Sequence, residues 1–472
     1  MRTPLLAAAF SIALPAQTSL LKNPDVQGSI RLFESWIEGQ MSYRGLPGIA
    51  AGVIHDRGLV WGRGFGYADL ASRTPVTTRT RFRMASHTKL FTATAILQLR
   101  DAGKLRLDDP VSRHLPWFGV KPASNDDGTI TIEHLLTHSS GLPREADAPY
   151  WITFRFPSYG DIQRTIGAQQ AAYPPDTRWK YSNLAFTLAG MIVEKVSGET
   201  WADYVQRHIL DPLGMKDSSI DKPVDGLATG YGRRMPDGSR QKMDFMDTRG
   251  IGPAAGLTST VEDMAKFVAL QFGKGKAGGA QILAGATLRE MHRVRVLENN
   301  WTRGNGLGFA VSRIKDKVYV GHGGSLAGYK THTYFSPEDR VGVVVLTNGD
   351  DSRPAQIAEK LIQTVGAEVA KAARGPAKPK LWNPAWRRYA GLYRSIWGDT
   401  EVVELNNQLV MIDPASDDPT DQLRIEPQPS GSFKLEGPSG GASVGERVEF
   451  IEEGGRVVRL RVGQVESVRV SK

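Results

Sequence analysis

The stretch AARGPAKPK at residues 372–380 divides the chain into two regions with different sequence patterns. Its prolines, its glycine and its interspersed basic residues are typical of a linker. A chain of 472 residues also exceeds the ~100–200 residues of an ordinary domain. We therefore predict two domains, residues 21–371 and 384–472, joined by a linker at residues 372–383.

The first region carries strand-like runs at both of its ends and helical patterns between them. Residues 48–69 contain two apolar runs joined by a turn-forming Asp-Arg-Gly, which predicts a hairpin, and further strands are predicted at residues 317–324 and 328–348. This order favours an α+β fold, in which helices flank an antiparallel sheet built from distant segments. For the helix predicted in the stretch GLTSTVEDMAKF, Thr258 or Ser259 is the expected N-terminal cap.

Short strand-like runs recur in the second region and are separated by Gly, Pro, Asp and Asn. They cover residues 401–405, 408–412, 447–451, 457–462 and 465–470. Short strands at such spacing favour a small all-β barrel or sandwich.

The composition excludes several classes of site and partner. The chain has no cysteine, which excludes disulfides, zinc–thiolate sites and a cysteine nucleophile. Its net charge of +9 is spread along the chain rather than gathered in a stripe, so we expect no nucleic-acid partner. We interpret the excess charge as a mildly basic surface.

Residues 1–20 have the pattern of a signal peptide. Arg2 provides a short positive region, an apolar run extends from Leu5 to Leu14, and small residues near Ala16 offer a cleavage site. We therefore expect an exported protein, periplasmic or secreted; a short helix packed on the body is the alternative. No other stretch approaches the ~20 apolar residues of a membrane-spanning helix.

Ser86 and Lys89 stand three residues apart at the start of a predicted helix. Residues at this spacing share one helix face, so the amine can reach the hydroxyl. A serine hydroxyl needs a nearby base to act as a nucleophile, and a lysine serves as that base if burial lowers its pKa. Taken alone, the pair has a plainer explanation, a capping serine beside a solvated lysine.

Tyr181-Ser182-Asn183 lies in a predicted loop that enters a buried helix. A tyrosine here can relay a proton to or from the serine or the leaving group. Asn183 can hydrogen-bond a substrate amide or carbonyl and can hold the lysine. The plainer explanation is a helix cap made by Ser182 or Asn183.

His322-Gly323-Gly324-Ser325 follows the predicted strand at residues 317–321. Glycines at a strand edge allow a ligand to approach the backbone, and an N–H after them can point at an oxyanion. A strand bend with a polar histidine is the plainer explanation.

These three motifs, in this order, resemble those of the serine β-lactamase and penicillin-binding-protein superfamily. The resemblance is greatest to the class C β-lactamase-like branch, which includes D-aminopeptidases, family VIII carboxylesterases and CubicO-type peptidases. It covers roughly residues 29–365 and is carried by MASHTKLFTATAILQL, TIEHLLTHSSGLP, KYSNLAFTLAGMIVEKVSG, HILDPLGM, AAGLTSTVEDMAKF and GHGGSLAGY. Residues 384–472, which begin with the segment PAWRRYAGLYRS, resemble the lipocalin-like barrel that often follows CubicO-type peptidases.

The resemblance implies a role for each motif residue. Ser86 would be the nucleophile, Lys89 its base and Tyr181 a general acid or base. Asn183 would contact the substrate. The backbone N–H groups of Ser86 and Ser325 would form the oxyanion hole, next to Gly323 and Gly324. No metal and no organic cofactor is implied.

His322 departs from the β-lactamase pattern, in which a lysine stands at this place. A histidine is mostly neutral at pH 7, so it does not supply the fixed charge that holds a β-lactam carboxylate. We therefore favour hydrolysis of an ester or of an amide or peptide bond, as in D-aminopeptidases and esterases, over β-lactam hydrolysis. Alternatives of another class are a penicillin-binding sensor that does not turn over and an assembly protein.

Other residues carry weaker alternatives. His134 and His138 are four apart and could share a helix face, but no further metal ligands accompany them, so we interpret them as packing residues. Trp151, Phe154 and Phe156 are core residues or the wall of a pocket for an apolar acyl group. The expected partner is a small-molecule or peptide substrate, and oligomers could form through the C-terminal domain.

Overall fold

The computed structural model describes residues 20–125, 128–273, 276–277, 280–375, 382–405, 407–414, 422–437 and 441–470. The chain forms two compact units that divide between Gly375 and Pro376. The predicted signal peptide lies almost wholly outside the described residues, as does the part of the predicted linker at residues 376–381.

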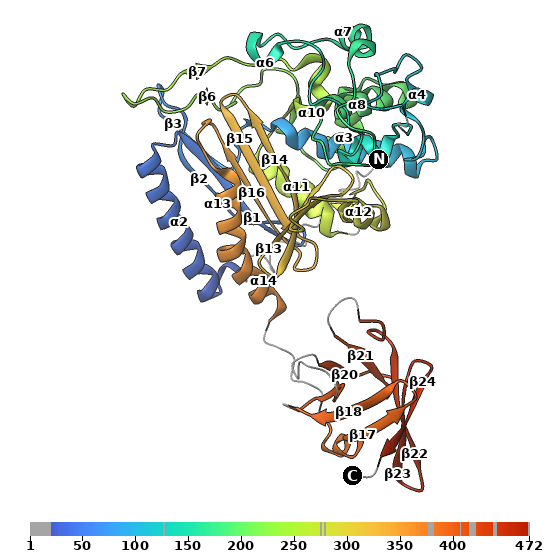
Figure 1. Ribbon diagram of the computed structural model, residues 1–472. Coiled ribbons are helices and arrows are strands. Elements are labelled where there is room, and N and C mark those ends of the chain that lie inside the picture. The colour runs from blue at the N-terminus through green and yellow to red at the C-terminus, as the bar shows by residue number, and fades with distance from the viewer. Residues whose placement is uncertain are drawn as a thin grey trace, which may run out of the picture. The chain divides into compact units, whose positions relative to one another are not determined.

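An antiparallel sheet organises the first unit (Figure 1). Among the described residues it contains nine strands in the order β11-β12-β13-β14-β15-β16-β1-β2-β3. Strands β1 and β16 pair from Ile49 opposite Thr347 to His55 opposite Val341, so the two ends of the unit supply neighbouring strands. The strands are β1 Gly48–His55, β2 Gly58–Asp69, β3 Thr74–Pro75, β11 Val296–Leu297, β12 Arg303–Asn305, β13 Ala310–Ile314, β14 Lys317–Leu326, β15 Tyr329–Ser336 and β16 Val341–Thr347.

Helices cover both faces of this sheet, because successive strand side chains point to opposite faces. Ile49, Ala51 and Val53 of β1 pack in one core with residues of α2, α13 and α14, whereas Ala50 and Ile54 pack in a larger core with α3, α8 and α11. The longer helices are α2 Pro24–Arg44, α3 Thr88–Asp101, α8 Asn183–Ser197, α11 Val261–Phe272, α12 Gly285–His292, α13 Pro354–Leu361 and α14 Ala367–Arg374, with a π-helical segment η5 at Ile362–Gly366.

Short elements fill the larger core and its surroundings. The helices are α4 Val111–His114, α5 Ile132–Thr137, α6 Tyr150–Thr153, α7 Tyr159–Thr165, α9 Trp201–Val205 and α10 Gly252–Ala255. The strands are β4 Phe82–Arg83, β5 Ser219–Ile220, β6 Gly230–Tyr231, β7 Lys242–Met243, β8 Leu257–Ser259, β9 Lys276–Ala277 and β10 Ala280–Gln281.

Two local predictions differ from the structure. Thr260, rather than Thr258 or Ser259, caps α11: its hydroxyl accepts a hydrogen bond from Asp263 N at 3.1 Å, because Thr258 and Ser259 belong to β8, which pairs with β4 and β5. Helix α14 also continues through residues 372–374 of the predicted linker. Its alanines and basic residues favour helix, and the helix ends at Gly375, where φ is +67°.

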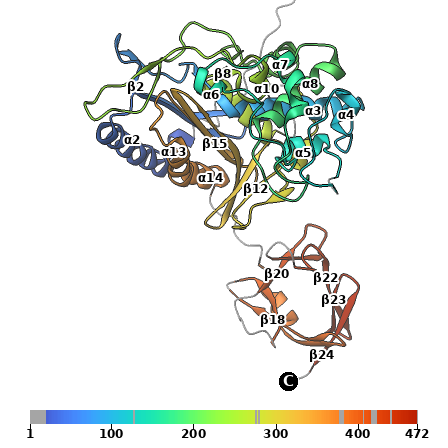
Figure 2. The ribbon, with the colours of Figure 1, turned by 45° about the horizontal axis from the view of Figure 1, so that its top comes forward.

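The second unit is a closed antiparallel barrel, and Figure 2 shows its strands arranged in a ring. Aromatic side chains help to fill the barrel: Tyr389 and Phe450 stack with ring centroids 4.1 Å apart, and Phe433 packs on both edge-on. The strands are β17 Gly391–Ser395, β18 Gly398–Glu404, β19 Leu409–Ile412, β20 Leu423–Pro427, β21 Phe433–Glu436, β22 Arg447–Glu453, β23 Arg456–Val462 and β24 Val465–Val470.

The predicted fold class is therefore confirmed: an α+β unit with a helix-flanked antiparallel sheet is followed by a small all-β barrel. In the part of the chain that the structure describes, no helix combines the length and the apolarity needed to cross a bilayer.

Candidate active site

Ser86 lies in a single 3₁₀ turn, η1 (Ala85–His87), directly before α3. The preceding residue, Ala85, has φ +48°, a left-handed conformation that residues with a Cβ seldom adopt. The hydroxyl of Thr88 donates to the carbonyl of Ala85 at 2.6 Å and holds the turn in place. Backbone strain of this kind concentrates at active sites. The turn leaves Ser86 half-buried, whereas Ala85 and His87 are buried.

Lys89 lies in the first turn of α3, and its side chain is fully buried. Its ammonium nitrogen donates to three acceptors: Asn183 Oδ1 at 2.7 Å, the carbonyl of Ala254 at 3.0 Å and Ser86 Oγ at 3.3 Å. Burial lowers the pKa of Lys89 to about 7, so a large share of the molecules carry a neutral amine at neutral pH. A neutral amine has only two N–H groups, and these are taken by Asn183 and Ala254. Its lone pair then faces Ser86 Oγ.

Tyr181 reaches Ser86 from the loop before α8. Its hydroxyl donates to Ser86 Oγ at 2.8 Å, and its ring lies 4.4 Å from the ring of His138. Burial raises the pKa of Tyr181 to about 12, so the phenol is protonated at neutral pH and acts as a donor.

His138 fixes the loop that carries Tyr181. Its Nδ1 accepts a hydrogen bond from Ser182 N at 3.1 Å, and its carbonyl accepts one from Lys180 N at 2.7 Å. Desolvation holds the pKa of His138 well below its usual range, so the ring is neutral. These contacts agree with the prediction that His138 is a packing residue.

Strand β14 brings the motif His322–Ser325 beside the turn that carries Ser86. A Cβ at Gly324 would lie 2.2 Å from the carbonyl oxygen of Met84, the residue before η1. Glycine at this position therefore lets the nucleophile turn pack on the strand, and the approach of a ligand to these glycines stays a prediction. A different group limits the space at Gly323: a Cβ there would lie 2.9 Å from Nδ1 of His332.

His322 is buried, and its ring centroid lies 6.5 Å from that of Tyr181. Its Nδ1 lies 2.6 Å from the carbonyl oxygen of Gly323. Because a carbonyl only accepts, Nδ1 carries the proton and Nε2 has a free lone pair. Burial lowers the pKa of His322 to about 4, so this side chain brings no positive charge to the site at neutral pH.

Of the other residues to which the sequence assigned a role, some are buried and some are exposed. Asn183 begins α8 and is buried beside Lys89, whereas Ser325 is exposed. The oxyanion hole made by the N–H groups of Ser86 and Ser325 stays a prediction. Phe156 is buried in the larger core, while Trp151 and Phe154 are partly exposed.

Three groups at the site were missed from the sequence. The carbonyl of Ala254 in α10 accepts from Lys89, and Glu145 Oε1 accepts from Asn183 Nδ2 at 2.8 Å. Arg144 places its guanidinium 5.5 Å from the ring centroid of Tyr181. Ala254 begins the stretch AAGLTSTVEDMAKF, but its carbonyl is a backbone group that the sequence pattern does not single out, and Arg144 and Glu145 belong to none of the quoted stretches. The nearest signal is that Arg144 and Glu145 directly follow the stretch HSSGLP.

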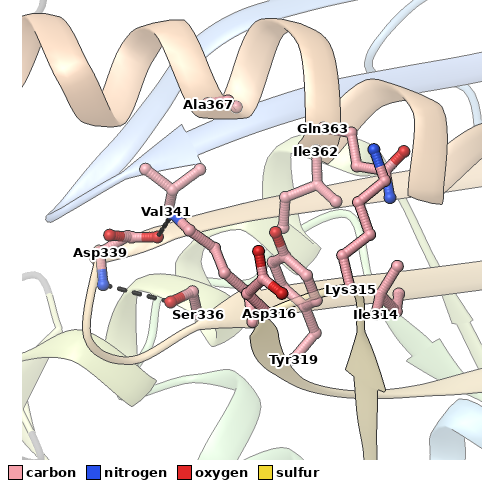
Figure 3. A pocket seen from close by; sticks show the side chains of 12 residues that line it. Ile314, Lys315, Asp316, Tyr319, Ser336, Asp339, Val341, Ile362, Gln363 and Ala367 are labelled. Atoms are coloured by element: carbon pink, nitrogen blue, oxygen red, sulfur yellow. Dashed lines mark hydrogen bonds and ion pairs between the residues drawn. The ribbon is translucent and has the colours of Figure 1, made fainter. Parts of the chain in front are cut away.

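A separate pocket of about 230 Å³ lies at the other end of β14 (Figure 3). It is lined by Lys315, Tyr319, Asp339, Ile362 and Gln363, among others, and contains none of the residues described above. The hydrogen-bonded group around Ser86, rather than this pocket, is therefore the candidate active site.

Comparisons with known proteins place the chain among relatives of known family. Protein flp of Staphylococcus aureus (strain MW2) is 25% identical over 335 residues, which cover 69% of this chain and 64% of that protein, less than two thirds of its length. Penicillin-binding protein 4* of Bacillus subtilis (strain 168) is 25% identical over 403 residues, 80% of this chain and 85% of that protein. The structure of the octameric penicillin-binding protein homologue from Pyrococcus abyssi superposes with a TM-score of 0.61 at 26% identity, covering 93% of this chain and all of that one.

The family model described as Beta-lactamase matches residues 33–367, which is more than half of the chain and includes Ser86, Lys89, Tyr181 and His322. The chain therefore belongs to the beta-lactamase family.

Proposed function

We propose that the chain is a serine hydrolase that forms an acyl-enzyme on Ser86. The observation that carries this proposal is the convergence of two groups on one hydroxyl: Ser86 Oγ lies 2.8 Å from the phenol of Tyr181 and 3.3 Å from the amine of Lys89. A neutral amine and a protonated phenol at these distances supply both a base and an acid.

In the acylation step, Ser86 Oγ attacks the carbonyl carbon of an ester or amide, and its proton passes to Lys89. The proton returns from the Lys89 ammonium to the leaving alkoxide or amine, with the phenol of Tyr181 as the relay. In the deacylation step, a water molecule attacks the ester on Ser86, and its proton is taken up by Lys89 through Tyr181 or by Nε2 of His322. The second step releases the acid and restores the Ser86 hydroxyl.

The electrostatics of the site favour esters, amides and peptides over β-lactams. A fixed cation on β14 would stabilise the carboxylate of a β-lactam, but the residue at this place, His322, is neutral because it is buried. A D-aminopeptidase or an esterase needs no such cation. We therefore place peptidase or esterase activity first and β-lactamase activity second.

A substrate panel tests this ranking. It would compare amides of D-amino acids, short-chain nitrophenyl esters and a chromogenic cephalosporin, with Ser86→Ala as the inactive variant and Ser430→Ala, at an exposed barrel serine, as the control. We expect turnover of esters or amides that Ser86→Ala abolishes and Ser430→Ala retains. Efficient cephalosporin turnover with inert esters and amides would reverse the ranking.

A sensor that does not turn over is the alternative from another class. A fluorophosphonate probe distinguishes the possibilities, because it reacts with an activated serine whatever the natural substrate is. Labelling together with turnover indicates an enzyme, labelling without turnover a sensor, and no labelling an assembly protein. The activated geometry of Ser86 favours labelling, which argues against a pure assembly protein, and the turnover assay then separates an enzyme from a sensor.

We also propose that copies of the chain associate through the barrel. The turn between β17 and β18 exposes 92% of Ile396 and 81% of Trp397, an unusual pair for a hairpin turn in contact with water. The related Pyrococcus abyssi protein is octameric. Light scattering on the wild type and Trp397→Ser tests this: a smaller assembly in the variant supports the proposal, and an unchanged mass contradicts it.

Export through residues 1–20 stays a prediction.

A further inference from the structure

Glu145 connects the candidate active site to the neighbouring helix α6. One carboxylate oxygen, Oε1, accepts from Asn183 Nδ2 at 2.8 Å, and the other, Oε2, accepts from the hydroxyl of Tyr150. The Glu145 carbonyl accepts from Gln169 Nε2 at 3.0 Å, which anchors the loop at this residue. The side chain is mostly buried, so these contacts are formed largely away from water.

The carboxylate decides which way the amide of Asn183 points. A side-chain amide has one donor end and one acceptor end. Because a carboxylate only accepts, Asn183 must turn its nitrogen toward Glu145 and its oxygen toward Lys89. The distance from Lys89 Nζ to Asn183 Oδ1 is 2.7 Å, a short hydrogen bond.

The orientation of Asn183 in turn fixes the amine of Lys89. Asn183 Oδ1 and the Ala254 carbonyl take up the two N–H groups of the neutral amine, so the lone pair is directed at Ser86 Oγ. If Asn183 turned its nitrogen toward Lys89, two donors would face each other and the lone pair would be drawn toward the amide instead. The base would then be wrongly oriented for the proton of Ser86.

We propose that Glu145 is a positioning residue for acyl transfer: through Asn183 it directs the lone pair of Lys89 at the hydroxyl of Ser86. This inference rests on the proposed role of Lys89 as the base. It goes further by assigning a task to a loop residue outside the three motifs.

The charges around Lys89 provide a second readout. Burial is the main reason that the pKa of Lys89 falls to about 7; the negative charge of Glu145 raises this pKa, and the positive charge of Arg144 lowers it. Tyr181 also faces the amine, and so do His138 and His322, but the phenol is protonated and both rings are neutral near pH 7. Removing the charge of Glu145 or that of Arg144 should therefore shift the pH dependence in opposite directions.

The test measures the second-order rate of fluorophosphonate labelling between pH 5 and 9, with kcat/KM for the best substrate of the panel. Glu145→Gln keeps an acceptor for Asn183 but loses the charge. We expect its rate on the high-pH plateau to stay within about threefold of the wild type. The acid limb, the part of the pH profile where the rate rises with pH, should move to lower pH by about half a pH unit or more. Glu145→Ala loses both the acceptor for Asn183 and the negative charge, so its plateau rate should fall by about tenfold to a hundredfold. Arg144→Gln, which removes the positive charge, should move the acid limb to higher pH.

Asp147→Asn is the matched control, because it removes a carboxylate from an exposed position of the same loop. We expect it to match the wild type in plateau and limb. Thermal unfolding of every variant confirms that the fold is retained. Glu145→Ala with the wild-type plateau and an unshifted limb would overturn the inference, and so would a Glu145→Gln plateau as low as that of Glu145→Ala.

Lys89→Met separates this inference from the proposed function. If Lys89→Met is not labelled while Glu145→Ala is labelled at the wild-type rate, Lys89 stands as the base and the role of Glu145 falls. If Lys89→Met is labelled at the wild-type rate, the proposed function falls, and the role of Glu145 falls with it.

Discussion

The phenol of Tyr181 donates a hydrogen bond to Ser86 Oγ over 2.8 Å, although the two residues are 95 positions apart in the chain. Three structural features maintain this contact: the turn at Ala85, the ring of His138 behind Tyr181, and the close packing of β14 on the residue before η1.

Tyr181→Phe removes the hydroxyl that contacts Ser86 but keeps a ring that can pack on His138. We expect kcat/KM to fall by about a hundredfold or more, because a positioned proton-transfer group contributes ~10²–10⁴-fold. The temperature of unfolding should change little. Steady-state kinetics and a thermal melt check both statements, and a variant with wild-type kcat/KM would remove Tyr181 from the mechanism.

The pH dependence should follow the amine of Lys89. Because burial lowers the pKa of Lys89 to about 7, the amine is protonated and inactive as a base below that pH and neutral above it. We expect kcat/KM to rise with pH through a midpoint near 7 and to reach a plateau. The phenol should not limit the plateau below about pH 12, the value to which burial raises the pKa of Tyr181. A midpoint near 4, the value to which the pKa of His322 is lowered, would point to that side chain instead.

Gly324→Ala should disturb the nucleophile turn. The added Cβ would lie 2.2 Å from the carbonyl oxygen of Met84, which is backbone and cannot rotate away. We expect a loss of about 1–3 kcal/mol in the free energy of unfolding and a lower labelling rate at Ser86. Gly39→Ala lies inside α2, where no described atom beyond the adjacent backbone of the helix comes within 4 Å of the new Cβ; it is the control and should be neutral or slightly stabilising. Equal behaviour of the two variants would contradict the packing argument.

Buried neutral histidines should make the first unit sensitive to acid. Burial lowers the pKa of His332 to about 3, and its buried Nε2 finds no hydrogen-bond partner among the residues that the structure describes. The unfolded chain binds a proton at this side chain below a pKa of ~6.5, whereas the folded chain does not, so stability is complete above that pH and declines as the pH falls toward 3. His332→Leu should reduce the loss between pH 6.5 and 4.5 by an amount of order 2 kcal/mol. Urea unfolding at pH 6.5 and pH 4.5 measures this loss in the free energy of unfolding. An identical loss in His332→Leu would contradict a contribution of His332 to the acid sensitivity.

The overall fold was accessible from the sequence because its signals are local. The hairpin at residues 48–69 has apolar runs and a turn, and it appears as β1 and β2. The change of pattern after residue 371 indicated the second unit, which is a closed barrel. The motifs around Ser86, Tyr181 and His322 could be identified because each has a characteristic spacing.

The features that the sequence did not reveal depend on long-range contacts. Glu145 becomes part of the site only because the loop after α5 carries it to Asn183, 38 residues further along the chain. Thr258 and Ser259 have the chemistry of helix caps, but pairing of β8 with β4 and β5 takes them into a strand. Gly324 lies close to Met84, and the sequence around either residue does not predict this contact.

Intact-protein mass spectrometry followed by peptide mapping, after reaction with a fluorophosphonate, tests the central claim most directly. Convergence of Lys89 and Tyr181 on one hydroxyl predicts a single adduct that maps to Ser86, forms faster as the pH rises through about 7, and is absent from Ser86→Ala. An adduct on another residue, or one that Ser86→Ala forms at the wild-type rate, would contradict the account.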